Sequence, residues 1–307
     1  MLDTPPTLLD QSLADPDRTV DASSLLEVWH QADIRFDCER PTGLDEPWRL
    51  PHRIRGAVGH QLRGSASPAA RNGRPCPWTP PCAHDLLYRT RTVPDLRQPL
   101  ATPWVIAAEA PDDTTVTVTN SLFGWAVDWI GEVAEAATQA LNGHAPTPAA
   151  HRLRLPVRSR AITVLEGIPD PTAWPDDAPA VLDFRTPVLF RDGDRPHATL
   201  ADLPLRLADR LEALAPWMGV RLRVKAAALQ ALAETLPRDE SGLRPFAGMR
   251  RSHPQGRRVP VEGRVGPLLL GAPPPMLVPY LVLGQWTHVG SRAGLGQGRY
   301  SLRPLPR

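Results

Sequence analysis

The 307-residue chain is predicted to fold as an α+β protein with two units. Segments with strand periodicity and segments with helix periodicity alternate along the whole chain. Its 37 prolines and 22 glycines favour many short elements separated by turns over a few long helices. A chain of this length can bury two cores of ordinary size, and residues 142–150, rich in proline and alanine, suit a boundary. We therefore expect an N-terminal domain at 1–150 and a C-terminal domain at 151–307.

In the first half of the chain, local patterns predict each element in turn. Polar and apolar residues alternate at 32–38, as in a strand with one buried face. At 51–64, Ile54, Val58 and Leu62 recur at four-residue spacing and form the apolar stripe of a helix. The remaining predicted elements are a loop, two strands and a helix, at 65–81, 104–108, 115–119 and 121–141.

The second half is predicted to continue the alternation of strands and helices. Residues 224–236 are rich in alanine and leucine, which have high helix propensity. The run Arg191-Asp-Gly-Asp-Arg195 predicts a turn. Residues 257–270 have a strand pattern and are strongly basic. The other predicted elements are strands at 151–164, 181–191 and 300–305 and helices at 200–214 and 280–286.

Positive charge is concentrated in two parts of a chain whose formal net charge is only +2. Residues 241–307 contain ten arginines and one acidic residue, and residues 48–97 contain nine arginines and two aspartates. Residues 1–47 offset this charge with eleven acidic residues and three arginines. Every basic residue except Lys225 is an arginine, whose planar guanidinium suits phosphate oxygens. Two basic regions in a nearly neutral chain indicate a surface that binds a polyanion.

A glycine-rich loop at 285–300 points most directly to a phosphate backbone. Glycine lacks a Cβ, so its amide can approach a phosphate closely, and arginine adds fixed positive charge. A flexible turn ahead of an edge strand is the alternative interpretation of the glycines. The residues expected to contact phosphates are Gly290, Ser291, Arg292, Gly294, Gly296, Gly298 and Arg299.

Cysteine usage and hydropathy indicate a cytoplasmic protein without a metal centre. The sequence has no run of about 18 apolar residues and no basic, apolar leader at its start. Three cysteines cannot all pair, and such sparse use suits a reducing compartment. Cys76, Cys82 and His84 raise the alternative of a zinc site, but the cysteine spacing is wider than usual and no fourth ligand is evident. We therefore expect no metal, no cofactor and no membrane association.

Three stretches of the sequence resemble one known protein family. They lie at 55–63 (Arg-Gly-Ala-Val-Gly-His-Gln-Leu-Arg), at 184–190 (Phe-Arg-Thr-Pro-Val-Leu-Phe) and at 283–300, which holds the glycine-rich loop. In order and spacing they resemble the CRISPR-associated endoribonucleases that process precursor crRNA, the sixth numbered Cas family of the RAMP superfamily. The resemblance implies two tandem ferredoxin-like (RRM-like) domains, the second with a C-terminal glycine-rich loop that contacts RNA.

The resemblance also implies metal-independent cleavage of RNA. The 2′-hydroxyl beside the scissile phosphate acts as the nucleophile, so the protein accepts one proton, donates another and stabilises charge on phosphorus. Histidine suits proton transfer near neutral pH. The expected products carry a 5′-hydroxyl and a 2′,3′-cyclic or 3′ phosphate.

Three histidines are candidates for this proton transfer. His60 is the first, because it lies on the predicted helix at 51–64, opposite the apolar stripe and one turn before Arg63. The resemblance places the active histidine of many relatives on that helix. His288 is the second because it adjoins the glycine-rich loop, and His52 is the third. A packing role is the alternative for His60 and for His288.

The polar side of the same helix adds Arg53, Arg55 and Arg63 as RNA-binding candidates. Trp78 and Tyr300 lie near basic loops and are candidates for base stacking. The implied partners are CRISPR repeat RNA, as precursor and as crRNA, and other Cas proteins of an effector complex. The alternative function is a non-catalytic crRNA-binding subunit of such a complex. A DNA-binding regulator is disfavoured because no helix-turn-helix pattern or dimerisation heptad stands out.

Overall fold

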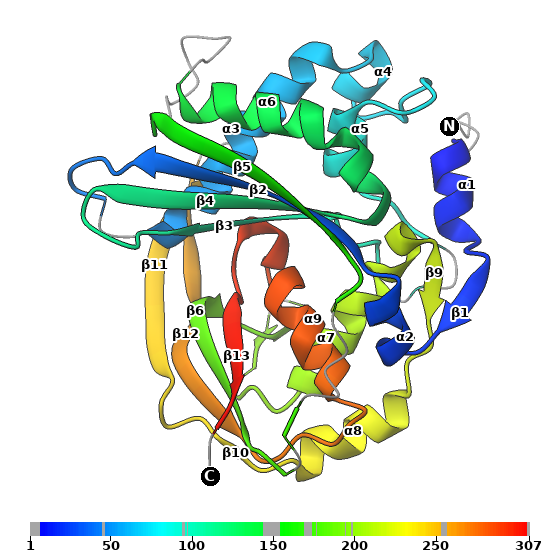
Figure 1. Ribbon diagram of the computed structural model, residues 1–307, viewed down its shortest axis with the longest axis vertical. Helices are drawn as coiled ribbons and strands as arrows, with labels where there is room; N and C mark the ends of the chain where they lie inside the picture. Colours follow the sequence, from blue (N-terminus) through cyan, green and yellow to red (C-terminus); the bar gives the residue numbers. More distant parts are fainter. Residues whose placement is uncertain are drawn as a thin grey trace. The chain divides into compact units, whose positions relative to one another are not determined.

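The computed structural model describes residues 7–44, 47–93, 96, 98–143, 154–168, 174–175, 177–193, 195–197, 199–252 and 257–305. The chain forms two compact units (Figure 1). Unit 1 consists of Met1–Thr19, Val28–Gly167 and Ala213–Arg221. Unit 2 consists of Val20–Glu27, Ile168–Glu212 and Leu222–Arg307. Each unit is therefore assembled from three separate segments of the chain.

Unit 1 is built on an antiparallel sheet with the strand order β3-β4-β2-β5. Helix α3 connects β2 to β3, and helix α6 connects β4 to β5. This βαββαβ order, with the first and third strands central, defines a ferredoxin-like fold. The elements are β2 (His30–Glu39), α3 (Leu50–Ser65), β3 (Trp104–Glu109), β4 (Thr115–Phe123), α6 (Ile130–Leu141) and β5 (Val157–Glu166).

The core of unit 1 lies between one face of this sheet and the helices α3 and α6 (Figure 1). Ile34 and Phe36 of β2 are fully buried, as the alternating pattern predicts. Helix α3 buries Ile54, Val58 and Leu62, which confirms the apolar stripe. Burying one such side chain stabilises the folded state by about 1.5–3 kcal/mol. The same burial turns the other side of α3 toward solvent.

Shorter elements complete unit 1. Helix α1 (Leu8–Ala14) begins with a capping box formed by Thr7 and Asp10, and α5 (Ala83–Tyr88) packs against α3. The strands β1 (Arg18–Val20) and β9 (Val220–Leu222) pair in a two-stranded sheet. The remaining short helices are η1 (Pro47–Arg49), α4 (Pro68–Arg71), η2 (Gly124–Trp129) and η4 (Ala215–Met218).

Unit 2 repeats the ferredoxin-like order. Its sheet has the strand order β10-β12-β6-β13, and β11 also pairs with β12. Helix α7 follows β6, and α9 connects β12 to β13, which are the helix positions of this fold. The elements are α2 (Ala22–Glu27), β6 (Ala180–Val188), β7 (Arg191–Asp192), β8 (Arg195–Pro196), α7 (Leu203–Glu212), α8 (Ala226–Thr235), β10 (Arg238–Asp239), β11 (Arg244–Ser252), β12 (Arg257–Leu270), α9 (Val278–Thr287), η5 (Ala293–Leu295) and β13 (Tyr300–Pro304).

The predicted α+β class with two ferredoxin-like units is confirmed, but unit 1 reaches beyond residue 150. The strand expected at 151–164 is β5, which pairs with β2 and is the fourth strand of unit 1. Its expected first residues, 151–153, lie outside the described residues. Residues 213–221 also belong to unit 1. None of the described helices has the length and apolar character needed to cross a membrane.

The helix predicted at 121–141 is wrong over residues 121–129. Strand β4 continues to Phe123, η2 follows, and α6 begins only at Ile130. Gly124 has a φ of 56°, and a Cβ at this position would overlap the backbone carbonyl of Trp217. Because only glycine fits both the backbone angle and the close approach, the chain turns here before the helix begins.

Candidate nucleic-acid interface

The outer side of α3 in unit 1 carries four of the predicted site residues. Arg53 and Arg63 are exposed, and His52 and His60 are half-buried. The Arg63 Nη2 atom donates a hydrogen bond to the Arg71 carbonyl oxygen at 3.0 Å. This contact ties Arg63 to the end of the short helix α4, while its position on the helix keeps it at the surface.

His60 lies on a part of α3 whose outer surface is open. Gly56 and Gly64 lie one turn before and one turn after it, and a Cβ added at either position would meet nothing within 4 Å. The His60 Nε2 atom is shielded, and it has no hydrogen-bond partner among the described residues. A shielded polar atom without a partner costs free energy unless a ligand supplies one. His84 and His288 also have a shielded ring nitrogen without a partner among the described residues, so the open helix surface is what distinguishes His60 as a candidate for a ligand contact.

Arg55, which the sequence predicts as an RNA-binding residue, packs against two aromatic rings. Its Cζ atom lies 5.1 Å from the ring centroid of Tyr88 and 4.7 Å from that of Trp104. Its Nη2 atom donates to the Leu87 carbonyl oxygen at 3.0 Å, and the Tyr88 hydroxyl donates to the Arg55 carbonyl oxygen at 2.5 Å. Burial lowers the pKa of Arg55 and raises the pKa of Tyr88. Arg55 therefore holds α5 and β3 against α3.

His84 is a second titratable group near α3, considered from the sequence only as a metal ligand. Its ring stacks on Tyr88, with centroids 5.2 Å apart and planes 15° apart. Burial and the nearby charge of Arg63 lower the pKa of His84, so the neutral form is favoured. Among the described residues, no group of three or more His, Cys, Asp or Glu is placed to hold a metal ion, so the positions of Cys76, Cys82 and His84 give the zinc alternative no support.

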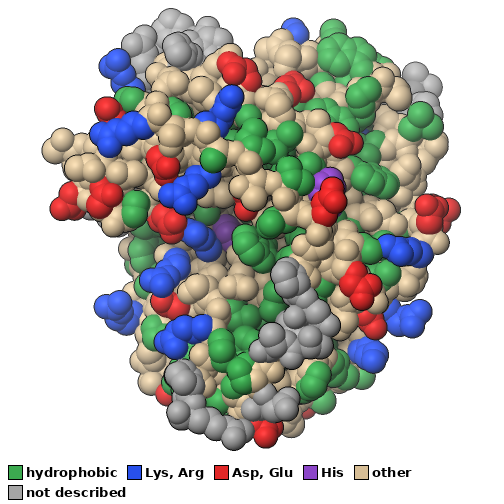
Figure 2. Space-filling model, in the orientation of Figure 1, with side chains coloured by type: hydrophobic (Ala, Val, Ile, Leu, Met, Phe, Trp, Pro, Cys, Tyr) green, Lys and Arg blue, Asp and Glu red, His purple; other side chains and the backbone are tan. Residues whose placement is uncertain are grey.

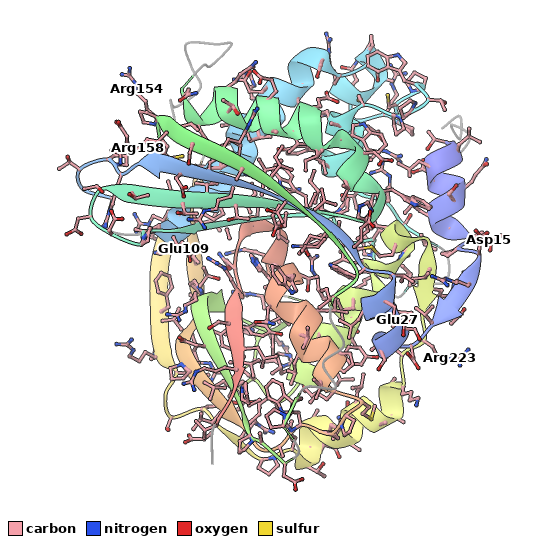
Figure 3. All side chains as sticks on the ribbon, in the orientation of Figure 1. Asp15, Glu27, Glu109, Arg154, Arg158 and Arg223 are labelled. Atoms are coloured by element: carbon pink, nitrogen blue, oxygen red, sulfur yellow. The ribbon has the colours of Figure 1, made fainter. Side chains whose placement is uncertain are left out.

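Strand β5 presents a basic surface that the sequence-based predictions did not include. It is an edge strand paired with β2, and nearly all of its residues are exposed. Arg154 and Arg158 project outward near its start (Figure 3), and Arg160 is also exposed. The space-filling view shows Lys and Arg side chains at the upper left, with acidic side chains among them (Figure 2). The close spacing of arginines at 151–160 is the signal in the sequence.

The glycine-rich loop of unit 2 uses most of its backbone amides internally. The amides of Ser291 and Gly298 donate to carbonyl oxygens at the end of β6, at 2.8 Å and 3.0 Å. Other amides that donate within unit 2 are those of Val289, Leu295, Gly296, Gln297 and Arg299. An amide that already donates to the protein is not free to donate to a phosphate. The expected amide cradle therefore does not form at Ser291, Gly296 or Gly298 in this conformation.

The glycines of this loop are required by its own packing. Gly290, Gly296 and Gly298 have φ values of 87°, 83° and 69°. A Cβ at Gly298 would overlap the Val289 carbonyl oxygen, and one at Gly290 would lie 2.7 Å from another carbonyl oxygen. Gly294 differs, because a Cβ there would meet nothing within 4 Å. The turn interpretation thus accounts for three glycines, whereas Gly294 has open space at its Cβ position.

His288 is buried at the end of α9. It is 2% exposed and has a φ of 60°, which residues other than glycine rarely adopt. Burial and the positive charges of Arg299 and Arg210 lower the pKa of His288 to about 3. An imidazole in this environment is neutral at physiological pH and cannot act as a cationic proton donor. Its hydrogen bond to the Ala293 backbone favours a role in orienting the loop.

The two arginines of the loop are half-buried. Arg292 donates from Nη1 to the Pro260 carbonyl oxygen at 3.1 Å. Tyr300, by contrast, is 3% exposed, and its hydroxyl donates to a carbonyl oxygen of α9. This burial excludes Tyr300 as a base-stacking residue, whereas Trp78 of unit 1 is 48% exposed. The accessible candidates in unit 2 are therefore Arg292, Gly294 and Arg299.

Both units have the ferredoxin-like order, and the second carries the glycine-rich loop before its last strand. The family model described as CRISPR-associated endoribonuclease Cas6 matches residues 182–300, from β6 to the start of β13. The match to this family covers less than half of the chain. No curated protein matches the chain.

Similar solved structures share this fold. The Cas6 (TTHB231) product complex covers 91% of this chain and 100% of its own, with 15% identity and a TM-score of 0.55. The Cas6 (TTHA0078) product complex covers 90% and 100%, with 20% identity and a TM-score of 0.52. Thermus thermophilus Cas6 (TTHB231) covers 90% and 98%, with 18% identity and a TM-score of 0.51. At these identities the likeness concerns the fold.

Proposed function

We propose that the chain is an endoribonuclease that binds CRISPR repeat RNA and cleaves precursor crRNA without a metal ion. The observation that carries the proposal is the match of residues 182–300 to the Cas6 endoribonuclease family. Two of the similar solved structures are Cas6 product complexes, and they share the fold of this chain. The proposed partners are repeat RNA and, after cleavage, other Cas proteins of an effector complex.

In the proposed reaction the RNA supplies its own nucleophile. The 2′-hydroxyl attacks the adjacent phosphorus, the bond from phosphorus to the 5′-oxygen breaks, and the products carry a 2′,3′-cyclic phosphate and a 5′-hydroxyl. The protein accepts the proton of the 2′-hydroxyl and donates a proton to the leaving oxygen. It also stabilises the negative charge that develops on the phosphate oxygens. Imidazole and guanidinium groups can perform each of these tasks.

His60 is the residue proposed for proton transfer. The open helix surface at Gly56 and Gly64 gives an RNA backbone room to approach it. Arg63 lies one turn away and brings a positive charge that can stabilise the transition state. His288 is not proposed, because its burial keeps it neutral. His52, half-buried in the first turn of α3, is the remaining alternative.

A cleavage assay with a matched repeat RNA tests the function. The purified chain is incubated with the RNA in excess EDTA, and the ends of the products are identified by mass spectrometry. We expect cleavage at one site. A 2′-deoxy substitution immediately 5′ to the scissile phosphate should abolish cleavage and leave binding nearly intact, because phosphate contacts hold the strand. Efficient cleavage of the deoxy substrate would exclude the mechanism.

The same assay distinguishes the alternative function. Binding of the repeat RNA without cleavage, in EDTA and with added divalent cations, would support a non-catalytic crRNA-binding subunit. Cleavage that occurs only with added divalent cations would support the endoribonuclease function but would contradict the proposal that cleavage needs no metal ion.

His60→Ala should lower the single-turnover cleavage rate by about 10²-fold or more, the usual effect of removing a general acid or base. RNA affinity should change little, because the imidazole acts on the transition state. Rapid-quench kinetics and a binding titration measure the two quantities. His52→Ala on the same helix is the matched control and should retain activity. If His52→Ala loses activity and His60→Ala does not, the two roles are exchanged.

A further inference from the structure

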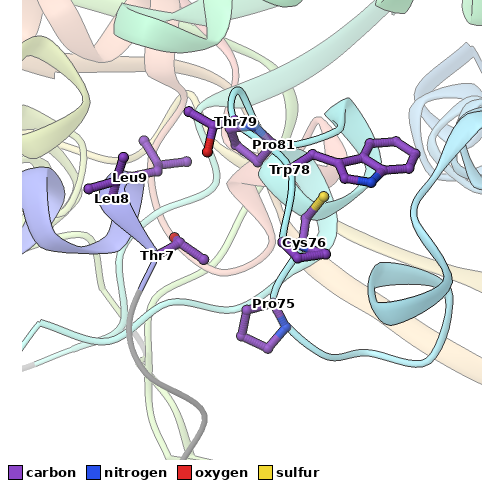
Figure 4. A pocket seen from close by; sticks show the side chains of 9 residues that line it. Thr7, Leu8, Leu9, Pro75, Cys76, Trp78, Thr79 and Pro81 are labelled. Carbon is purple, nitrogen blue, oxygen red and sulfur yellow. The ribbon is translucent and has the colours of Figure 1, made fainter.

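The loop between α4 and α5 in unit 1 borders a cavity. The cavity has a volume of about 380 Å³ and lies between the start of α1 and this loop (Figure 4). Leu8 and Leu9 form part of the wall on the α1 side, and Cys76, Trp78 and Thr79 form part of the wall on the loop side. Cys76 is the one nucleophilic thiol in this lining.

Cys76 and Cys82 are held in contact by this loop. The Cys82 amide donates a hydrogen bond to the Cys76 Sγ atom at 3.4 Å, and the Cys82 thiol also hydrogen-bonds to Cys76. Both are buried in one cluster with Ala66 and Ala70. The Cys76 amide donates to the Asp85 Oδ1 atom at 3.1 Å, which fixes the loop further. Both cysteines are free thiols.

Two thiols in contact can bind a metal ion or form a disulfide. Among the described residues, no group of three or more His, Cys, Asp or Glu suited to a metal ion includes them. Disulfide formation requires that the two sulfur atoms approach each other in a suitable geometry. The loop holds the Cys82 amide 3.4 Å from the Cys76 Sγ atom and places the two thiols in a hydrogen bond. We propose that Cys76 and Cys82 are a redox-modification site, where an oxidant of the hydroperoxide class converts the two thiols into a reversible disulfide.

The proposed oxidation takes two steps. The Cys76 thiolate attacks one oxygen of hydrogen peroxide and the O–O bond breaks, which gives a sulfenic acid and a hydroxide that takes up a proton to become water. The Cys82 sulfur, on losing its proton, attacks the sulfenic sulfur; the S–S bond forms and the S–O bond breaks, releasing a second water. The two thiols lose two electrons in total, and the peroxide gains them. A dithiol reductant reverses the change by thiol–disulfide exchange.

The surroundings of the two sulfurs suit these different roles. Burial raises the pKa of the Cys76 thiol, but hydrogen bonds from Ser67 and from the Cys82 and Trp78 backbones outweigh burial and lower it. Burial raises the pKa of Cys82. The thiol that ionises more readily is the one that attacks the peroxide. Cys38 is an internal control, because it does not line the cavity and burial in β2 raises its pKa to about 12.

Thiol mapping of the folded full chain tests the proposal. The chain is treated with hydrogen peroxide near neutral pH, quenched with catalase, denatured, alkylated, digested and analysed by mass spectrometry. We expect two of the three thiols to be lost together, with Cys76 and Cys82 joined and Cys38 still alkylated. Dithiothreitol should restore both. Equal oxidation of all three cysteines, a disulfide that involves Cys38, or a pair that stays reduced would overturn the proposal.

Two variants separate the roles of the thiols. Cys82→Ser suits the fold, because Cys82 occupies the N-cap of α5 and serine is a favoured N-cap residue. In this variant, oxidised Cys76 should stop at the sulfenic acid and be captured by dimedone as a mass adduct. Cys76→Ser should give no adduct at Cys82. An adduct at Cys82 equal to that at Cys76 would overturn the assigned roles.

Discussion

Arg53 and Arg55 lie two positions apart on α3 and have opposite surroundings. Arg53 is exposed, whereas the guanidinium of Arg55 lies between the rings of Tyr88 and Trp104. A planar guanidinium can face two aromatic rings and still donate hydrogen bonds at its edge, which a lysine ammonium cannot do. The same residue type therefore contributes surface charge at one position and packing at the other.

Arg55→Lys should lower the free energy of unfolding by about 1–3 kcal/mol, because it loses the ring contacts and the hydrogen bond to Leu87. Urea denaturation measures the change. Arg53→Lys is the matched control on the same helix and should remain within about 0.5 kcal/mol of the original chain. Equal stability of the two variants would show that the ring contacts contribute nothing.

His288 should make the stability of unit 2 depend on pH. Its folded-state pKa, about 3, is below its ordinary value of 6.5, so the unfolded state binds more protons between these values. Its contribution to stability is therefore complete above about pH 6.5 and is lost as the pH falls toward 3, with a slope of up to about 1.4 kcal/mol per pH unit.

His288→Asn tests this dependence, because asparagine keeps a polar side chain that can hydrogen-bond but does not titrate. Urea denaturation of both chains between pH 7 and about pH 4.5 gives the slopes. The variant should show the shallower loss of stability on acidification, whatever its absolute stability. Parallel curves would mean that His288 is accessible to protons in the folded state.

At the scale of elements, a buried ion network fastens α1 to α5. Arg89 donates to Asp10 Oδ1 at 2.6 Å and to Asp85 at 2.8 Å. Arg91 donates to Asp10 at 3.1 Å and to Asp85 at 2.5 Å, and its side chain is only 4% exposed. A buried charge that loses its partner is strongly destabilising. Arg89 and Arg91 therefore each form ion pairs with both Asp10 and Asp85, which lie far apart in the sequence.

Asp10→Asn should lower the free energy of unfolding by about 1–3 kcal/mol and increase hydrogen exchange in α1. Although burial raises the pKa of Asp10, the hydrogen bond from Arg89 and the neighbouring charges outweigh it and lower the pKa. The contribution of Asp10 is therefore present above its unfolded pKa and lost as the pH falls through its folded pKa. Asp15→Asn, at an exposed carboxylate after α1, is the control. If hydrogen exchange in α1 is unchanged in Asp10→Asn, the ion pairs of Asp10 do not stabilise this helix.

Local periodicity predicts elements better than it predicts their partners. Strand β12 spans the predicted residues 257–270, and α3 extends the prediction by one residue at each end. The start of α6 was not predictable, because the conformation of Gly124 is set by a backbone contact with Trp217, distant in the sequence. The placement of β5 in unit 1 likewise depends on its register with β2. Non-local pairing thus limits what the sequence alone predicts.

The same limit applies to the candidate site. The helical period places Arg53, His60 and Arg63 away from the apolar stripe of α3, which the structure confirms. Whether an amide of the glycine-rich loop is free depends on carbonyl oxygens at the end of β6, which no pattern within the loop encodes. The burial of His288 depends in the same way on the packing around α9.

For the molecule as a whole, the small net charge results from opposing regions within one sequence. Exposed arginines occur on α3 and β5 in unit 1, and half-buried arginines occur in the loop before β13 in unit 2. RNA binding through arginines releases counterions, so its affinity falls as the salt concentration rises. The slope of this dependence reports how many phosphate contacts a given set of arginines makes.

Arg292→Ala with Arg299→Ala should reduce the slope of log affinity against log salt concentration by about 1.4, since each contact to single-stranded RNA contributes about 0.7. Arg53→Ala with Arg63→Ala tests the α3 surface in the same way. Binding titrations over a range of salt concentrations give the slopes, and Arg223→Ala, at an exposed arginine outside these surfaces, is the control. If a folded double variant shows an unchanged slope, the two substituted arginines do not contact RNA phosphates.

Unit 1 is completed late in synthesis, because its last segment follows residues 168–212 of unit 2 in the chain. Trp217 donates from Nε1 to the Ala101 carbonyl oxygen at 3.0 Å, and the Trp217 carbonyl lies against Gly124. Residues 213–221 leave the ribosome roughly 50 residues after Gly167, a delay of roughly 3 to 10 s at ordinary rates of translation. During that interval the nascent chain has made β5 but lacks Trp217, so the surface around Ala101 and Gly124 is open to other chains and to chaperones.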